Sequence, residues 1–408
     1  MVIALALGGP AAAQDYDTNN VYVQPFVGSG FYGYYDGQGV LTMFNAPSAI
    51  AADASGNLFV HDSNNNRIRK ITPGGTVTTF AGGGNGSLPG FGTNVALPYN
   101  YYGGTMTIDH ANNLWLLLGG YLLRIGPDAY VAPQNANIPV SYSSPAGLCV
   151  DSANNIYYSS ENRIFRYNQS NGQSEVFAGS GNQGPSDGNW IFTSFYSPTA
   201  LAADAANNIY VWDSGNRLLR RINPNRDVET IVFANSPNCA YCDVDGSGGQ
   251  AQFAYVNGMC VDNLGNVLLA CGTSVRKLTV TTNATTLAGS FTQNGYTNGI
   301  GAVARFNNAR GICVSQSSIV IADYGDHRIR KILFDPPPQI VPDSNLRLQM
   351  LPSLRITGEV GRTYRIESSS NLTNWSAEAN VLLTSTPYLW LDESAPGQTK
   401  YYRTFLLP

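Results

Sequence analysis

The sequence is short of charge, of histidine and of long apolar runs, and each shortage argues against a class of protein. Charged residues make up 12% of the 408 positions, and the formal net charge is −4. This acidic balance argues against a protein built to hold nucleic acid. No stretch is long and apolar enough to predict a transmembrane helix. Nucleophile-elbow, Walker and dinucleotide-binding motifs are also missing from the sequence.

The six cysteines are too few and too scattered to predict a disulfide framework. Cys149, Cys260 and Cys313 occupy equivalent positions in the phrases GLCV, GMCV and GICV, which is typical of a small buried residue. Cys239 and Cys242 form the loop CAYC, with no second such pair and no histidine nearby. A local disulfide is therefore favoured over a zinc site.

The N-terminus predicts a signal peptide, residues 1–13, that lacks its basic start. Residues 2–7 are apolar, and three alanines at 11–13 precede Gln14 as they do at a signal-peptidase site. The first lysine or arginine of the chain is Arg67. A plain N-terminal tail is the alternative interpretation.

What the chain does contain is a repeated phrase. GNLFVHDSNNNRIRKI at residues 56–71 returns as NNIYVWDSGNRLLRRI at 207–222 and as IVIADYGDHRIRKI at 319–332. The full unit, residues 47–82, alternates four β-branched or aromatic runs with turns rich in glycine, asparagine and aspartate. It predicts a four-stranded antiparallel meander, in which Asp53 accepts backbone N–H groups of the ASGN turn.

The aspartate that closes the first strand of each unit counts the repeats. It recurs at Asp53, Asp109, Asp151, Asp204 and Asp262, and Ser315 replaces it in a sixth unit. The sixth unit stops after its third strand, while residues 21–30, VYVQPFVGSG, match a fourth strand. These units predict an all-β, six-bladed β-propeller that is closed by the N-terminal strand, which removes the free sheet edges.

The repeat resembles the NHL repeat. The phrase PSAIAADASGNLFVHDSNNNRIRKI carries the resemblance, together with the linkers DGQGVLTMFNAP, DGSGGQAQF and NGIGAVARFNNA, which are similar to linkers of bacterial NHL proteins. The resemblance covers residues 21–335. It implies a propeller that binds ligands at its top face, around the mouth of the central channel.

Beyond three consecutive prolines the pattern changes. Residues 336–345 predict a proline-rich linker, and the short alternating runs of residues 346–408 predict a small β-sandwich. The phrases YRIESSSNLTNW and YYRTFLLP resemble the fibronectin-III-like C-terminal domain of secreted bacterial proteins, which implies an accessory or attachment module.

Three aspartates are candidates for a ligand site at the top face. Asp62, Asp213 and Asp323 end the second strand of their units, four or five residues before an arginine: Arg67, Arg217 and Arg328. One interpretation is an acidic ring at the channel mouth. The alternative is a structural contact with an arginine or with the backbone that pins the next turn. The basic residues of the third strands are expected on half-solvated faces.

Aromatic residues of the linkers form a second candidate set, because such rings suit stacking on sugars or protein recognition. The set comprises Tyr34, Tyr35, Tyr101, Tyr102, Trp190 and Tyr196. The recurrent linker phenylalanines are expected in the core instead: Phe44, Phe195, Phe253 and Phe306.

No cofactor is predicted. His61, His110 and His327 fall on different strands and turns and should not converge on a metal, although NHL-like peptide-amidating lyases use histidine ligands. The phrase DVDGSGG at Asp243 matches the first half of a calcium loop, but Ala254 stands where the loop needs glutamate. Calcium is therefore kept only as an alternative.

The sequence favours a secreted, non-catalytic recognition or scaffold protein. Its propeller would bind an extracellular glycan or protein at the top face, and its C-terminal domain would attach it. An enzyme is the competing class: a lyase, lactonase or hydrolase with a channel-mouth site, with or without a metal. A structural surface protein without a small ligand is the third.

Overall fold

The fold is known from a computed structural model. It describes residues 18–99, 103–134, 146–233, 243–334, 353–356, 359–371, 373–383, 388–391 and 401–407. The chain divides into two compact units, Met1–Pro337 and Pro338–Pro408. The predicted signal peptide lies outside the described residues. Within the described ranges, no helix has the length and hydropathy needed to cross a membrane.

The described part of the first unit contains six antiparallel sheets of four or five strands, numbered here in chain order. Sheet 1 consists of β2 (Gly37–Gln38), β3 (Pro47–Ala52), β4 (Leu58–Asp62), β5 (Arg67–Ile71) and β6 (Thr76–Gly82). Sheet 2 consists of β7 (Gly90–Phe91), β8 (Thr105–Ile108), β9 (Leu114–Leu118), β10 (Tyr121–Ile125) and β11 (Tyr130–Pro133). Sheet 3 consists of β12 (Leu148–Val150), β13 (Ile156–Ser160), β14 (Arg163–Asn168) and β15 (Gln173–Ala178). Sheet 4 consists of β16 (Gly188–Asn189), β17 (Pro198–Ala203), β18 (Ile209–Asp213), β19 (Leu218–Ile222) and β20 (Asp227–Phe233). Sheet 5 consists of β21 (Gly246–Ser247), β22 (Gly258–Val261), β23 (Val267–Ala270), β24 (Ser274–Leu278) and β25 (Asn283–Gly289). Sheet 6 consists of β26 (Gly299–Ile300), β1 (Val21–Val27), β29 (Arg328–Phe334), β28 (Ser318–Asp323) and β27 (Ala309–Ser315).

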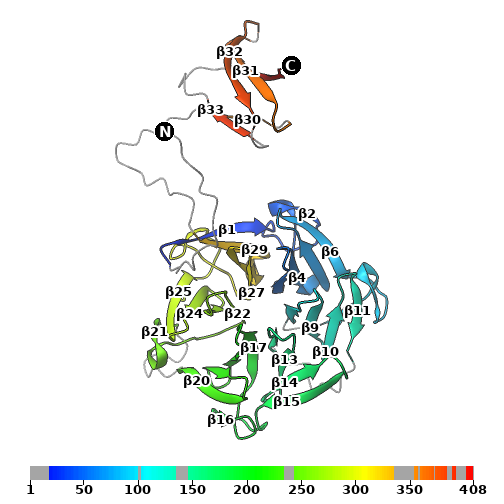
Figure 1. The fold of residues 1–408 in the computed structure, drawn as a ribbon, viewed down its shortest axis with the longest axis vertical. Coiled ribbons are helices and arrows are strands. Elements are labelled where there is room, and N and C mark those ends of the chain that lie inside the picture. The colour runs from blue at the N-terminus through cyan, green and yellow to red at the C-terminus, as the bar shows by residue number, and fades with distance from the viewer. Residues whose placement is uncertain are drawn as a thin grey trace. The chain divides into compact units, whose positions relative to one another are not determined.

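The sheets stand around a central axis with their first main strands innermost (Figure 1). These inner strands contact one another in the order β3, β8, β12, β17, β22 and β27, and β27 contacts β3 again. This is the arrangement of a β-propeller. The loops that the structure describes contain five short 3₁₀ helices: η1 (Gly39–Leu41), η2 (Ser63–Asn65), η3 (Gly92–Asn94), η4 (Gly248–Gln250) and η5 (Tyr324–Asp326).

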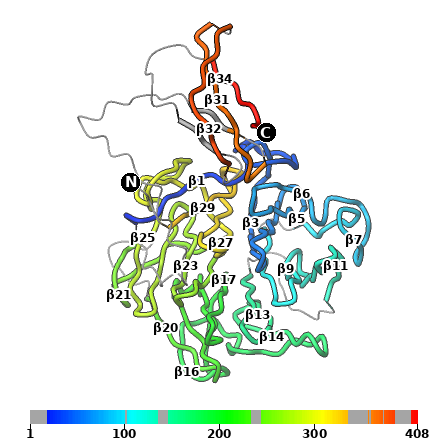
Figure 2. The backbone as a smooth tube through the Cα atoms, turned by 45° about the horizontal axis from the view of Figure 1, so that its top comes forward, coloured from blue at the N-terminus to red at the C-terminus, as the bar shows by residue number. Residues whose placement is uncertain are grey.

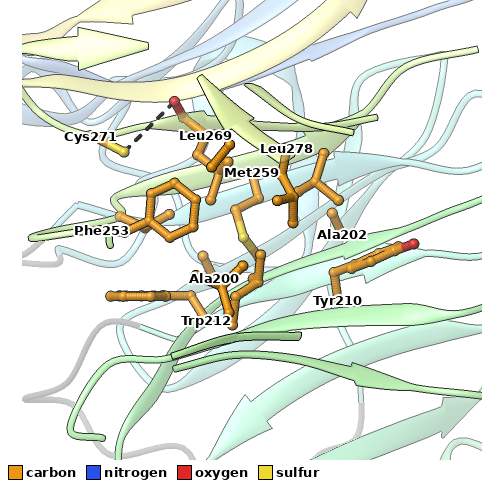
Figure 3. Packing of buried hydrophobic residues seen from close by; sticks show 14 of the residues in the cluster. Ala200, Ala202, Tyr210, Trp212, Phe253, Met259, Leu269, Cys271 and Leu278 are labelled. Atoms are coloured by element: carbon orange, nitrogen blue, oxygen red, sulfur yellow. Dashed lines mark hydrogen bonds between the residues drawn. The ribbon is translucent and has the colours of Figure 1, made fainter. Parts of the chain in front are cut away.

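Neighbouring sheets bury their faces on each other. Figure 3 shows sheets 4 and 5, where Trp212 of β18 meets Phe253 edge to face, with ring centroids 6.2 Å apart. Met259 of β22 and Tyr210 of β18 belong to the same buried cluster. Alternating apolar residues on facing strands therefore form the core between sheets.

The N-terminal strand belongs to the last sheet. β1 runs antiparallel beside β29, with Val23 opposite Ile332 and Gln24 opposite Lys331, and the two lie side by side in Figure 2. Val21, Val23 and Val27 are fully buried. Residues 21–27 thus lie beside the third main strand of sheet 6 and pack into its core.

The turns after the inner strands follow the predicted chemistry. Asp53 Oδ1 accepts hydrogen bonds from the backbone N–H of Ser55 and of Asn57 at 2.9 and 2.8 Å, and Asn57 Nδ2 donates to Oδ2 at 2.8 Å. The same three bonds recur at Asp109, Asp151, Asp204 and Asp262. The prediction for Asp53 is confirmed.

A buried arginine joins the loops of a sheet to its strands. Arg69, the third residue of β5, is fully buried and donates to Asp62 Oδ2 at 2.8 Å and to Asp36 Oδ1 at 2.6 Å. Its other bonds go to the backbone oxygens of Met43 and Tyr35. The guanidinium carbon lies 4.9 Å from the Phe44 ring centroid. One cation thus holds the linker, the end of β4 and the linker phenylalanine together.

The arrangement recurs in sheets 4, 5 and 6, where Arg220, Arg276 and Arg330 are also fully buried at the third position of the third strand. Their linker phenylalanines lie 4.8 to 4.9 Å away and are fully buried, as predicted. The expectation of half-solvated basic residues is wrong for these four arginines. Leu123 and Phe165 fill the position in sheets 2 and 3.

Two small antiparallel sheets make up the described strands of the second unit. β31 (Thr363–Ser369) lies between β32 (Ser376–Leu382) and β34 (Tyr401–Leu406), and β30 (Ser353–Ile356) pairs with β33 (Tyr388–Leu391). Its buried cluster consists of Ile356, Ile366, Val381 and Leu383.

Deleting residues 21–27 should destabilise the whole first unit, because β29 would lose one of its two neighbouring strands and expose buried valine and isoleucine surface. Urea unfolding followed by tryptophan fluorescence should show a lower midpoint for the entire transition. Deleting residues 2–13 is the control and should leave the midpoint unchanged. A separate, minor unfolding step in the strand deletion would contradict the expectation.

Replacing Arg220 with leucine should cost about 3–5 kcal/mol of unfolding free energy, because it leaves the buried Asp213 carboxylate without its cation. Arg221→Leu is the matched control, since the adjacent Arg221 pairs with Glu229 at the surface, where such pairs contribute about 1 kcal/mol or less. Adding Asp213→Asn to the Arg220 variant should recover part of the loss in chemical denaturation. Equal effects of the two leucine variants would sink the expectation.

Candidate functional site

A cavity of about 590 Å³ opens at the end of the channel where the inner strands begin. All six inner strands or the residues just before them line it. The turns that follow the second strands lie at the same end, because the linker N–H of Asn45 donates to Asp62 Oδ1 at 2.7 Å. This end is called the top face, and the cavity is called the mouth cavity.

A simple sequence offset locates four residues of the mouth cavity. The fourth residue after each linker phenylalanine lies at or just before the start of an inner strand and lines the cavity: Ser48, Thr199, Asn257 and Arg310. The buried arginine fixes the phenylalanine, and the short segment after it carries the chain to the channel. None of these four was singled out from the sequence, although the offset was visible there.

Two tyrosines and two arginines give the cavity its chemical character. Tyr196 and Tyr255 line it and are 39% and 59% exposed. Arg217 and Arg310 also line it, and the lining residues in the described part of the chain include no aspartate or glutamate. In a protein of net charge −4, the described lining of the mouth cavity thus carries cationic side chains and no acidic ones.

Arg310 is held against an aromatic ring. Its guanidinium carbon lies 3.6 Å from the ring centroid of Tyr324, which belongs to η5. Partial burial lowers the pKa of Arg310, and the nearby Tyr324 works against that shift. The cation–π contact orients the side chain and offsets part of its lost hydration.

Ser48 lines the mouth cavity and contacts a buried histidine. Its Oγ lies 3.0 Å from His61 Nδ1, which also accepts the Gly104 N–H at 3.3 Å. Burial lowers the pKa of His61 to about 4, so the imidazole is neutral at pH 7. Such a weak base is poorly matched to general-base catalysis near neutral pH, which weighs against Ser48 as an activated nucleophile.

A second cavity, of about 460 Å³, lies farther along the inner strands. Cys149, Cys260 and Cys313 line it, and their cysteine side chains take the small-residue role that the repeat predicts. Burial raises the pKa of the Cys313 thiol to about 12 and moves those of Cys149 and Cys260 in the same direction. These thiols are therefore protonated and unreactive at neutral pH.

The three candidate aspartates are interior residues. Asp62, Asp213 and Asp323 are fully buried and bind Arg69, Arg220 and Arg330 at 2.8, 3.1 and 3.0 Å. Burial raises their pKa values, and the bonds from arginine and backbone N–H groups oppose that shift. The turn-pinning alternative describes this arrangement, and an acidic ring exposed to a ligand does not.

The arginines that follow these aspartates by four or five residues have other contacts. Arg67 donates to the backbone oxygen of Asn65 at 2.7 Å, and Arg328 donates to that of Ser29 at 2.6 Å. Arg217 lines the mouth cavity. The true partners stand two or three residues farther along the strand.

Of the candidate aromatic residues, the structure brings Tyr196 to the mouth cavity. Tyr34 lies at the outer strands instead, with its hydroxyl 2.8 Å from Thr79 Oγ1, and neither it nor the exposed Tyr35 lines the cavity. Trp190 packs against the core of sheets 3 and 4. Tyr101 and Tyr102 lie outside the described residues.

The remaining chemical candidates have local partners. His327 Nδ1 accepts the Ala46 N–H at 3.0 Å, and His110 lies in an exposed turn. Asp243 and Asp245, the calcium alternative, bind Arg276 at 3.2 and 2.7 Å. Both carboxylates thus form ion pairs with the buried arginine of sheet 5. Cys239 and Cys242 lie outside the described residues.

Comparisons with known proteins agree with the fold. No protein-family model matches the chain. It is 24% identical over 338 residues to NHL repeat-containing protein 2 of Homo sapiens, a match that covers 76% of this chain and 42% of that protein. The chain thus spans about two fifths of the length of this curated relative.

Solved structures with low sequence identity share the propeller-like fold. A Bacteroides thetaiotaomicron protein of unknown function superposes with a TM-score of 0.60 at 19% identity, over 77% of this chain and 76% of that one. An auxiliary nutrient binding protein from Bacteroides ovatus gives 0.58 at 15% identity, over 77% and 76%. Another from Bacteroides thetaiotaomicron gives 0.59 at 15%, over 78% and 77%.

The buried His61 should make stability fall in acid. Because its folded-state pKa of about 4 lies below the ordinary 6.5, the unfolded chain binds the proton first, and stability present above pH 6.5 is lost as pH falls toward 4. This residue should contribute a loss of about 3 kcal/mol between pH 7 and pH 4.

Urea unfolding of the wild type and of His61→Asn across that pH range measures the contribution. The variant should lose less stability in acid by about that amount, since asparagine keeps an acceptor but no titrating group. His110→Asn, in an exposed turn, is the matched control. A His110 variant that flattens the pH dependence as much as the His61 variant would contradict the assignment.

Proposed function

We propose that the first unit is a six-bladed propeller closed by its N-terminal strand, and that it is a non-catalytic binding protein with its ligand site at the mouth cavity. The observation that carries the proposal is the cavity itself. It is open at the top face, is lined by residues of every inner strand, and has partly exposed tyrosines among its lining residues. Its volume lies within the range of about 300–1,000 Å³ that is common for small-molecule sites.

A glycan is the ligand that the lining favours. Ser48, Thr105, Ser197 and Thr199 supply hydroxyl groups, and Asn257 supplies an amide. Such groups can exchange hydrogen bonds with sugar hydroxyls, while the faces of Tyr196 and Tyr255 can cover the apolar side of a sugar ring. The names of the two auxiliary nutrient binding proteins support a binding role of this kind.

The remaining features fit an extracellular location. The signal-peptide pattern at residues 1–13 supports secretion, and the second unit would be a fibronectin-III-like β-sandwich that serves for attachment. The low charge and the many tyrosines agree with an extracellular β-protein. The proposed domains are the propeller at residues 21–335, the linker at 336–345 and the sandwich at 346–408.

Binding to a glycan array, followed by titration of the best ligand, tests the function. Tyr196→Ala and Tyr255→Ala should each weaken that binding by about tenfold or more, which corresponds to about 1.4 kcal/mol. Tyr35→Ala is the control, because Tyr35 is an exposed tyrosine that does not line the cavity. Binding lost only in the Tyr35 variant, or no binding to any glycan, would overturn the proposal.

A further inference from the structure

We propose that the ligand of the mouth cavity is a sugar that carries a carboxylate, and that Arg310 and Arg217 bind this group. The inference rests on the proposed function and adds the chemical class of the ligand. It starts from the charge of the cavity, which two arginines make positive without any aspartate or glutamate among the described lining residues.

The position of Arg310 suits a charge-specific contact. The residue lies on β27, the inner strand that follows the last linker, and its side chain lies over the Tyr324 ring at 3.6 Å. An arginine can bind a carboxylate through two parallel N–H···O bonds, and an adjacent ring holds its plane in place at little cost in entropy. A partly buried guanidinium also gains more from an anion than an exposed one does.

Gly103, which has no side chain, lies beside Arg310 in the lining of the mouth cavity. Gly103 has a φ of +79°, and a Cβ built there would lie 2.8 Å from Ser48 Cβ and 3.5 Å from an Arg310 guanidinium nitrogen. A larger residue would crowd both side chains and would be strained at this φ. Glycine therefore leaves space next to the serine hydroxyl and the arginine, where a carboxylated ring can enter.

Two carboxylates near the cavity are already bound to other arginines. Asp213 and Asp323, the acidic groups at the ends of β18 and β28, are buried and bound to Arg220 and Arg330. Their charges are thus neutralised by partners outside the cavity lining. Two arginines in a concave site then focus a positive potential on the entrance of an otherwise acidic protein.

The size and the other lining groups favour a sugar over a small inorganic anion. A cavity of about 590 Å³ is far larger than a sulfate or phosphate ion needs, and hydroxyl, amide and tyrosine side chains account for much of its polar lining. One carboxylate bound by arginine would orient the ring, and the remaining groups would contact its hydroxyls.

Isothermal titration of the full chain with matched sugars tests the inference. The probes are trigalacturonate, its neutral counterpart galactotriose, and inorganic phosphate. Trigalacturonate should bind at least tenfold more tightly than galactotriose, and phosphate should bind weakly. Arg310→Gln should remove most of that preference, Arg217→Gln should reduce it, and Arg310→Lys should restore part of it. Arg226→Gln, which removes a positive charge outside the cavity lining, is the control.

The outcomes separate the inference from the proposed function. Equal binding of charged and neutral trisaccharides, with both weakened by Tyr196→Ala, would overturn the carboxylate assignment and leave the glycan site standing. Phosphate binding as tight as trigalacturonate would show an anion site without sugar recognition. A preference unchanged in Arg310→Gln would exclude that residue. Binding of neither sugar would overturn the carboxylate assignment, and the glycan array would then decide whether the proposed function also fails.

Discussion

A buried arginine of the third strand fixes the path of the linker in four of the six described sheets, and the mouth cavity depends on this contact. In sheets 1, 4 and 5 it ties a strand to the linker that enters the sheet through a linker carboxylate, and in sheet 6 through the amide oxygen of Asn298. Backbone oxygens of the linker and a phenylalanine ring complete the contact. Burying a guanidinium is costly, and only a complete set of acceptors makes it tolerable. The linker must therefore adopt one path, and this long loop has as fixed a backbone conformation as a strand has.

That constraint is what makes a ligand site possible at the channel. Each linker phenylalanine is fixed under its arginine, so the residue four positions later reaches the mouth in the same way in four sheets. The scaffold is repetitive, but these mouth residues differ from sheet to sheet: serine, threonine, asparagine and arginine. The same arginine contact recurs in these sheets while the residue that it positions at the mouth varies, so a symmetric fold can form an asymmetric pocket.

The sequence predicted what lies within one repeat and missed what depends on packing between distant segments. The aspartate turns and the core phenylalanines follow from local patterns, since each needs only a strand period or a turn rule. The pairing of β1 joins distant segments, and it could be predicted because the last repeat lacks a fourth strand that residues 21–30 resemble. The partner of Asp62 does not, because Arg67 and Arg69 share one strand face and the linker decides which of them is enclosed. Ser48 and Arg310 share a position four residues after a linker phenylalanine, but only the fold shows that this position lies in one cavity.

The pairing of β1 with β29 has a consequence for how the chain is made. During translation β1 emerges before the other described strands of the first unit, and its partner β29 emerges after them. The nascent chain can form its middle sheets one by one, but its two ends cannot join until synthesis of the unit is nearly complete. Until β29 is made, the apolar face of β1 has no partner strand to cover it, so β1 can take its place in the sheet only at the end of this sequence of events.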